Sequence, residues 1–197
     1  MRHVVFDTET TGIPKDRRAP VTKLANWPRL VQVAWVTYDR SGAPGRAGEH
    51  LVRPEGFRIP AAASRVHGIR TAHALANGAP MADVLAAFLA AAEPWDTVFV
   101  AHNLDFDRPV LGAELLRTGY PLDEVQAFLK RPALCLMKAS APFCRIPGRC
   151  GKWKYPTLAE LHTKLFDEPP AESHRALADV EAAARCFFEL RRRGVVG

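Results

Sequence analysis

The sequence lacks the features that mark a membrane protein or a repeat protein. No apolar run approaches the roughly 20 residues that a transmembrane helix needs. No signal peptide precedes the first apolar stretch, so we expect a cytoplasmic protein. Internal repeats and low-complexity linkers are also absent, and a chain of 197 residues is long enough to bury one sizeable core. We therefore expect a single domain over residues 1–197.

Cysteine is scarce, and its spacing argues against a zinc site. The chain has four cysteines, Cys135, Cys144, Cys150 and Cys186, and none forms a Cys-x-x-Cys pair. Zinc sites need more ligands at tighter spacing. Cys144 and Cys150 flank a short segment that a disulfide could close, but free thiols are the favoured interpretation.

Acidic residues are outnumbered by basic ones. The chain has 27 Lys and Arg against 21 Asp and Glu, which gives a formal net charge of +6. A basic excess favours an anionic partner such as nucleic acid, although a basic surface alone is weak support. Acids gathered at one site of a basic protein would suggest a metal centre that handles a polyanion.

Two acids stand out near the N-terminus because they follow a short apolar stretch. His3–Phe6 is rich in β-branched residues and predicts a buried strand, and Asp7 and Glu9 come at its end. Residues i and i+2 of a strand point the same way, so the two carboxylates project together. A hard divalent cation would remove their repulsion. For a bare Asp-x-Glu, two solvated acids before a turn at Gly12 would be the simpler interpretation.

The remaining pattern predicts an α/β fold. We expect an antiparallel meander of three strands, in which the first strand is followed by residues 30–38 and 49–53. A wholly apolar strand at 97–101 should be parallel, and a fifth strand is expected near 133–136. Helices are predicted at 59–66, 81–92 (ended by Pro94), 108–119 (with Pro109 in its first turn), 158–166 (capped by Thr157 and Glu160) and 173–193.

Two more acids and one histidine complete a candidate site. Asp107 follows the fourth strand, at the edge where open α/β sheets place their sites. Asp179 lies in the last helix, and His174 is five residues earlier, so the two do not share a helix face. The four carboxylates suffice for two divalent cations about 4 Å apart. His174 is suited to accept a proton near neutral pH.

Three motifs occur in a fixed order along the chain. They are Phe6-Asp7-Thr8-Glu9-Thr10-Thr11-Gly12, His102-Asn103-x-x-Phe106-Asp107 and His174-x-x-x-x-Asp179, with Val66-His67-Gly68-Ile69 between the first two. Together they resemble the DnaQ-like 3′–5′ exonucleases of the DEDDh group. The resemblance covers most of the chain and implies an RNase H-like fold, with a mixed five-stranded sheet flanked by helices. It also implies a hydrolase that releases 5′-mononucleotides from a 3′ end.

The resemblance assigns a role to each motif residue. Asp7, Glu9, Asp107 and Asp179 would be ligands of two Mg²⁺ or Mn²⁺ ions, and His174 would be the general base. Asp105 is a rival for Asp107, and the Phe-Asp pairing of the motif favours Asp107. The residues expected to bind the substrate are Thr10, Thr11, His67 and Asn103.

The expected partner is nucleic acid with a free 3′ end, with DNA and single strands favoured and RNA an alternative. Basic and aromatic residues alternate within 141–156, where Trp153 and Tyr155 could stack on bases or pack onto the core. One competing function is a non-catalytic nucleic-acid-binding domain, which should have lost one of the five site residues. Another is the proofreading subunit of a polymerase. The long loop at 13–30 and the end of the chain just after its last helix favour a free-standing nuclease. The sequence leaves open whether the chain has a protein partner.

Overall fold

The centre of the fold is one mixed sheet whose strand order is β3-β2-β1-β4-β5. The computed structural model describes residues 1–93, 96–170 and 175–197. The strands are β1 (His3–Thr10), β2 (Leu30–Tyr38), β3 (Pro44–Leu51), β4 (Val98–Ala101) and β5 (Ala133–Cys135). β1 to β3 form the antiparallel meander, while β4 is parallel to β1 and β5 to β4. The predicted mixed five-stranded sheet is confirmed.

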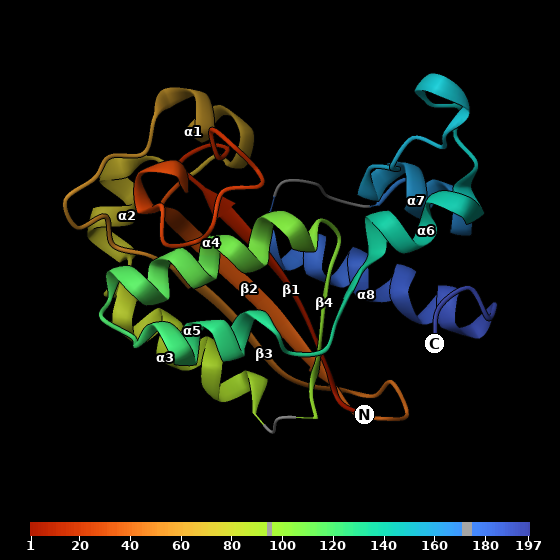
Figure 1. Ribbon diagram of the computed structural model, residues 1–197, viewed down its shortest axis with the longest axis horizontal. Helices are drawn as coiled ribbons and strands as arrows, with labels where there is room; N and C mark the ends of the chain where they lie inside the picture. Colours follow the sequence, from red (N-terminus) through yellow and green to blue (C-terminus); the bar gives the residue numbers. More distant parts are fainter. Residues whose placement is uncertain (94–95, 171–174) are drawn as a thin grey trace.

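Helices cover both faces of this sheet (Figure 1). One face carries α3 (Met81–Ala92), α4 (Leu104–Arg117) and α5 (Leu122–Leu129). The other carries α6 (Leu136–Cys144), α7 (Leu158–Phe166) and α8 (Ala176–Arg192). Two short helices, α1 (Ala61–His67) and α2 (Thr71–Asn77), pack beside β2. Two 3₁₀ turns, η1 (Leu24–Asn26) and η2 (Arg149–Gly151), lie in the connections.

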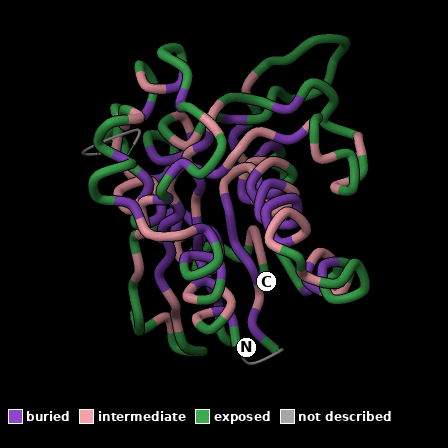
Figure 2. The backbone as a smooth tube through the Cα atoms, turned by 90° about the vertical axis from the view of Figure 1, so that its left-hand side faces the viewer, coloured by how far each residue is buried: buried purple, intermediate pink, exposed green. Residues whose placement is uncertain are grey.

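Successive side chains of β1 point alternately into the two halves of the core, one on each face of the sheet. Val4 and Phe6 point to the side of α3 and α4, where Phe6 lies 5.3 Å from the ring of Phe88. Val5 points to the opposite side, against α8 and Phe187. Each buried aromatic or aliphatic side chain contributes about 1.5–3 kcal/mol to stability. Buried residues line the central strands and the helix faces turned toward them (Figure 2).

β1 and α4 are both longer than the sequence pattern predicts. β1 continues to Thr10 because β2 pairs with it along its whole length, so Asp7 and Glu9 lie inside the strand and not after it. α4 begins at Leu104 because the Asn103 carbonyl already accepts hydrogen bonds from two amides of the helix. Pro109 therefore lies inside the helix, and its predicted place in the first turn is wrong.

Other boundaries follow packing that the local pattern does not reveal. β3 ends at Leu51 and does not reach the predicted end at residue 53. The short helices α2 and α5 are absent from the predictions, and α6 replaces the end of the predicted fifth strand and the start of the basic and aromatic segment 141–156. α3 and α7 match the predictions, including the Thr157–Glu160 capping box. The expected helix stop at Pro94 and helix start at Ser173 lie outside the described residues.

The structure bears on the cysteines and on the expected lack of a membrane-spanning helix. All four cysteines are free thiols, so the alternative disulfide between Cys144 and Cys150 is not formed. Among the described residues, no helix combines the length and the apolar character that crossing a bilayer requires.

Candidate active site

Asp7 and Glu9 face α8 because they continue the alternation begun by Val5. Residues two apart share one face of a strand, and α8 covers the face to which Val5 belongs. The first turn of α8 brings Asp179 to the same place. One carboxylate oxygen each of Asp7, Glu9 and Asp179 lie within 4.8 Å of one another, an arrangement that could hold a metal ion.

Asp107 joins these acids from the opposite side of β1. The parallel pairing of β1 with β4 ends at Val5–Val100, so the following part of β1 has no strand on that side. Thr8 there donates two hydrogen bonds to Asp107 Oδ1, from its backbone N–H at 3.2 Å and its hydroxyl at 2.7 Å. Thr8 is thus a site residue that the sequence did not single out, although it lies inside the first motif. It fixes Asp107 beside the acids of β1.

The acids border a cleft with a volume of about 500 Å³. Its walls come from β1, the start of α4, the start of α7 and the first turn of α8. The cleft therefore lies beyond the carboxyl end of β4 and beside the second half of β1, which has no strand on that side. This is the edge of the sheet at which the sequence predicted a site.

Burial and mutual repulsion raise the pKa of three of these acids. Burial, followed by the charges of Asp107, Glu9 and Asp179, raises the pKa of Asp7 well above its usual range. Burial and the charges of Asp179 and Asp107 raise the pKa of Glu9 to about 8. Burial raises the pKa of Asp107 to about 7, against the opposing hydrogen bonds from Thr8. Clustered acids that are reluctant to ionise are a suitable site for a divalent cation, which favours their charged form.

We expect the metal-free protein to lose stability as the pH rises from about 7 to 8.5. The folded-state pKa values of Glu9 and Asp107 exceed those of unfolded carboxyls, so the folded state holds more protons in this window. Each pKa unit corresponds to about 1.4 kcal/mol. The buried histidines, whose pKa values are lowered by burial, act in the opposite direction, but only up to about pH 7. Thermal denaturation in EDTA at several pH values measures the slope.

Glu9→Gln provides the control for this pH dependence, because it removes the carboxyl whose pKa is raised to about 8. The variant should have a flatter slope, and Mg²⁺ or Mn²⁺ should stabilise the native protein most at the alkaline end. If the stability of the metal-free protein fell with pH equally steeply in the native protein and in Glu9→Gln, the elevated pKa of Glu9 would be contradicted.

Asp107 and its rival Asp105 have different surroundings. Asp107 is 3% exposed and lines the cleft. The side chain of Asp105 is 57% exposed and forms an ion pair with Lys138 on α6. Only Asp107 therefore lies with the other acids, as the Phe-Asp pairing of the motif predicted.

Comparison with known proteins identifies the family of the chain. The exonuclease family model named RNase T matches residues 4–187. The chain belongs to this exonuclease family. The predicted DnaQ-like family is thereby confirmed, while membership of the DEDDh group stays a prediction, because His174 lies outside the described residues.

Several relatives of this exonuclease domain are known. DNA polymerase III PolC-type of Lactococcus lactis is 29% identical over 195 residues, which is 97% of this chain and 10% of that protein. Three-prime repair exonuclease 1 of Homo sapiens is 36% identical over 131 residues, which is 61% of this chain and 40% of that protein. The structure of E. coli exonuclease I in complex with a dT13 oligonucleotide is similar, with a TM-score of 0.76 and 20% identity over 98% of this chain and 41% of that one. The chain thus spans less than half the length of each.

The residues expected to bind a terminal nucleotide lie around the end of β1. Thr10 is buried and its hydroxyl donates to the Gly12 carbonyl at 2.6 Å. Gly12 has a φ of 150°, which favours glycine and allows the sharp turn that the sequence predicted. The Thr11 hydroxyl accepts a hydrogen bond from the Arg29 amide at 2.9 Å. Both hydroxyls of the exonuclease motif therefore already shape the turn after β1.

His67 is the last residue of α1, and it is buried. The side chain is only 8% exposed, and its Nδ1 accepts a hydrogen bond from the Ile69 amide at 3.1 Å. Burial lowers the pKa of His67, against an opposing contact with the Thr10 backbone. That contact places the His67 turn beside the end of β1.

Asn103 and His102 form the wall of the cleft next to α4. Asn103 is the N-terminal cap residue of α4, but its side chain makes no capping hydrogen bond and lines the cleft. His102 Nε2 lies 3.0 Å from the Pro156 carbonyl, which ties α4 to the segment that leads into α7. Burial lowers the pKa of His102. The sequence motif identified both positions, but not the link of His102 to Pro156.

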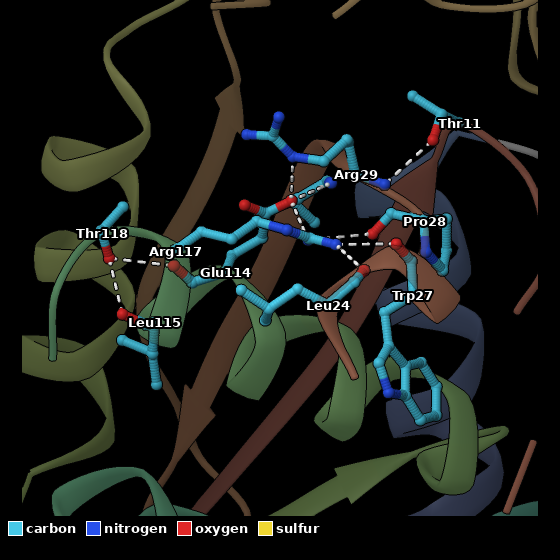
Figure 3. Close-up of polar contacts among 10 residues, drawn as sticks. Thr11, Leu24, Trp27, Pro28, Arg29, Glu114, Leu115, Arg117 and Thr118 are labelled. Carbon is cyan, nitrogen blue, oxygen red and sulfur yellow. Dashed lines mark hydrogen bonds and ion pairs between the residues drawn. The ribbon is translucent and has the colours of Figure 1, made fainter. Parts of the chain in front are cut away.

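A buried ion-pair cluster anchors the loop that follows the first motif (Figure 3). Glu114 of α4 is fully buried, and its Oε1 accepts hydrogen bonds from Arg29 Nε at 2.8 Å, Arg117 Nη1 at 2.9 Å and the Leu30 amide at 3.0 Å. Arg117 also donates to carbonyls of the loop, including Leu24 at 2.6 Å and Trp27 at 2.8 Å. Since Arg29 in turn binds Thr11, α4 holds the end of the loop next to the turn after β1.

Proposed function

We propose that this chain is a metal-dependent 3′–5′ exonuclease of the DEDDh group that acts on nucleic acid, with single-stranded DNA as the favoured substrate. The observation that carries the proposal is the convergence of Asp7, Glu9 and Asp179 with Asp107 at one cleft. The family membership of the chain supports an exonuclease. A non-catalytic domain would have no need to keep buried acids together against their mutual repulsion.

The chemistry of the acids suits hard divalent cations, and two Mg²⁺ or Mn²⁺ ions would be the cofactors. All the donors are carboxylate oxygens, which these hard cations prefer, and burial makes an unneutralised cluster costly. Asp7, Glu9, Asp107 and Asp179 would hold the ions. Bound there, divalent cations would stabilise the charge that develops on the phosphate during an in-line displacement.

The other residues would place the substrate and move one proton. Asn103 would donate from the cleft wall, and His67, Thr10 and Thr11 would surround the terminal nucleotide at the end of β1. His174, five residues before Asp179, would take the proton from the attacking water as a general base. The leaving group would be the 3′ oxygen of the shortened strand, and the product would be a 5′-mononucleotide.

The preference for single-stranded DNA rests on similarity and on charge. The similar exonuclease I structure holds a dT13 oligonucleotide, and the human relative is named a three-prime repair exonuclease. The net charge of +6 suits a polyanion. RNA remains the alternative substrate, because the residues of the cleft do not themselves distinguish the two sugars.

The proposal predicts a ladder of products that shorten from the 3′ end. We expect single strands labelled at the 5′ end to shorten stepwise with Mg²⁺ or Mn²⁺, and EDTA to stop the reaction, because the acids cannot act without a cation. Strands labelled at the 3′ end should release the label as a mononucleotide at once. Parallel reactions on DNA and RNA measure the preference. Strands that stay intact with either metal would overturn the proposal and favour a binding domain.

A second candidate is an exonuclease that edits the product of a DNA polymerase. Two relatives favour it by their names, DNA polymerase III PolC-type and, at 33% identity over 190 residues, a DNA polymerase III subunit epsilon-like protein of Rhodobacter capsulatus. This chain covers 10% and 23% of these proteins. Recovery of a polymerase with the chain from its own cells would support this candidate, and recovery of the chain alone would favour a free-standing nuclease.

A further inference from the structure

We propose that the segment of residues 145–156, between α6 and α7, is a stacking platform for the part of a single strand that lies 5′ of the cleft. Trp153 and Tyr155 would stack on unpaired bases, and the cations of the segment would contact the phosphates between them. The inference rests on the proposed function, because it assumes that a 3′ end occupies the cleft. It adds a second contact surface outside the cleft.

The two aromatic rings lie open to solvent. The exposed fraction is 49% for Trp153 and 53% for Tyr155, whereas Trp27 and Trp35 are each 4% exposed in the core. The alternative that the rings of 141–156 pack onto the core is therefore wrong for these two residues. Large exposed aromatics are typical of binding surfaces, because each offers a wide apolar area to a partner.

The backbone holds these rings on a defined turn. Trp153 forms a β-bridge with Pro147, and the amides of Gly148 and Lys154 donate to the carbonyls of Lys152 and Ile146 at 3.0 and 2.9 Å. A Cβ at position 148 would lie 2.5 Å from the Lys152 carbonyl oxygen, so only glycine fits this close approach. A rigid turn loses little entropy when a strand binds to it.

The charge of this region is of one sign. No Asp or Glu occurs between Glu124 and Glu160, and that interval contains seven Lys and Arg residues. In the described part of the chain, Arg149 and Lys152 have no carboxylate partner, while Lys154 pairs with Glu160 at 2.6 Å. Arg149 and Lys152 are therefore available to phosphates, which matches a nucleic-acid strand better than an apolar partner.

The platform continues directly into the cleft. Tyr155 precedes Pro156, whose carbonyl contacts His102, and Thr157 belongs to the cleft wall. The segment with η2 projects beyond α6 and α7, on the side toward which β1 runs (Figure 1). A strand with its 3′ end among the acids could leave the cleft past Tyr155 and then reach Trp153. The residues thus supply consecutive contacts for nucleotides next to the reacting one.

Replacing both rings by alanine should weaken the binding of long strands without changing the reaction in the cleft. The loss of one stacking interaction corresponds to about 5-fold to 150-fold in affinity per base. For Trp153→Ala/Tyr155→Ala we expect at least that rise in KM on DNA and RNA strands of about 20 nucleotides. The rate on the p-nitrophenyl ester of thymidine 5′-phosphate, which reaches only the cleft, should stay unchanged. Exposed side chains can be removed with little effect on folding.

Two further variants separate stacking from other effects. Trp153→Phe/Tyr155→Phe keeps both rings and should restore most of the affinity. Leu122→Ala removes another exposed apolar side chain, on α5. It should change neither the KM on long strands nor the rate on the ester. Arg149→Ala/Lys152→Ala should reduce the slope of log Kd against log salt by about 0.7 for each phosphate that the variant no longer neutralises.

The outcomes distinguish the platform from the proposed function. An active native protein whose KM on long strands is the same in the alanine variant would overturn the platform and leave the exonuclease intact. A native protein that binds strands but hydrolyses neither strand nor ester would contradict the exonuclease. In that case weaker binding of long strands by Trp153→Ala/Tyr155→Ala would support the platform, and unchanged binding would overturn it. Equal losses on the strand and on the ester would assign the rings to the cleft itself and so refute a separate surface.

Discussion

Replacing Asp7 by Asn is expected to lower the rate of hydrolysis about a thousand-fold or more while the metal-free protein becomes more stable. Asp7 is the acid whose pKa is raised by the charges of all three others, Asp107, Glu9 and Asp179. The amide removes one charge from this cluster, which relieves repulsion in the folded state and weakens the hold on cations. Single-turnover rates on a labelled strand and thermal denaturation in EDTA measure the two effects.

The matched controls are Asp107→Asn and Asp105→Asn, two residues apart on α4. Asp107→Asn should lose activity as Asp7→Asn does, because Asp107 is buried beside Thr8 at the cleft. Asp105→Asn should keep nearly full activity, because that carboxylate lies outside the cleft and pairs with Lys138. Loss of activity in Asp105→Asn alone would reverse the assignment. A loss of stability in Asp7→Asn would mean that the acids do not repel one another as their pKa values indicate.

The parts of the site that sequence could predict depend on local periodicity. Asp7 and Glu9 share a face because strand side chains alternate and β1 continues through both residues to Thr10. Asp107 was likewise placed correctly although its helix begins four residues earlier than predicted. Errors in the ends of elements therefore did not disturb the prediction of which acids meet.

The parts that could not be predicted depend on contacts between distant residues. Thr8 donates hydrogen bonds to Asp107, which lies 99 positions later, and no local sequence pattern predicts that pair. The exposure of Trp153 follows from a turn closed by Pro147 and by the small size of Gly148, so both interpretations of the basic and aromatic segment were open in the sequence. Glu114 did leave a signal, since it falls on the same helix face as Val110 and Leu111, where an acid needs a partner.

Replacing that buried Glu114 by Ala is expected to destabilise the protein by about 3 kcal/mol. The change removes the carboxylate that both Arg29 and Arg117 contact and leaves a cavity beside α4. Breaking a fully buried ion pair can cost about 5 kcal/mol of stability. The side chains of Arg29 and Arg117 are 27% and 15% exposed, so water can solvate them and offset part of this loss. For a chain of this size the midpoint should fall by about 6 to 12 °C, as measured by thermal or urea denaturation.

The controls for Glu114 separate a structural role from a chemical one. Glu114→Gln keeps the shape and one acceptor oxygen, so it should lose less stability than Glu114→Ala. Glu49→Ala, which removes an exposed acid on β3, should leave the midpoint unchanged within error. Below its midpoint, Glu114→Ala should still hydrolyse DNA, because the four acids of the cleft are intact, but with a raised KM, because the loop bound to Thr11 is no longer held by α4. A loss of rate as deep as that of Asp7→Asn, with the midpoint unchanged, would instead place Glu114 in the chemistry of the cleft.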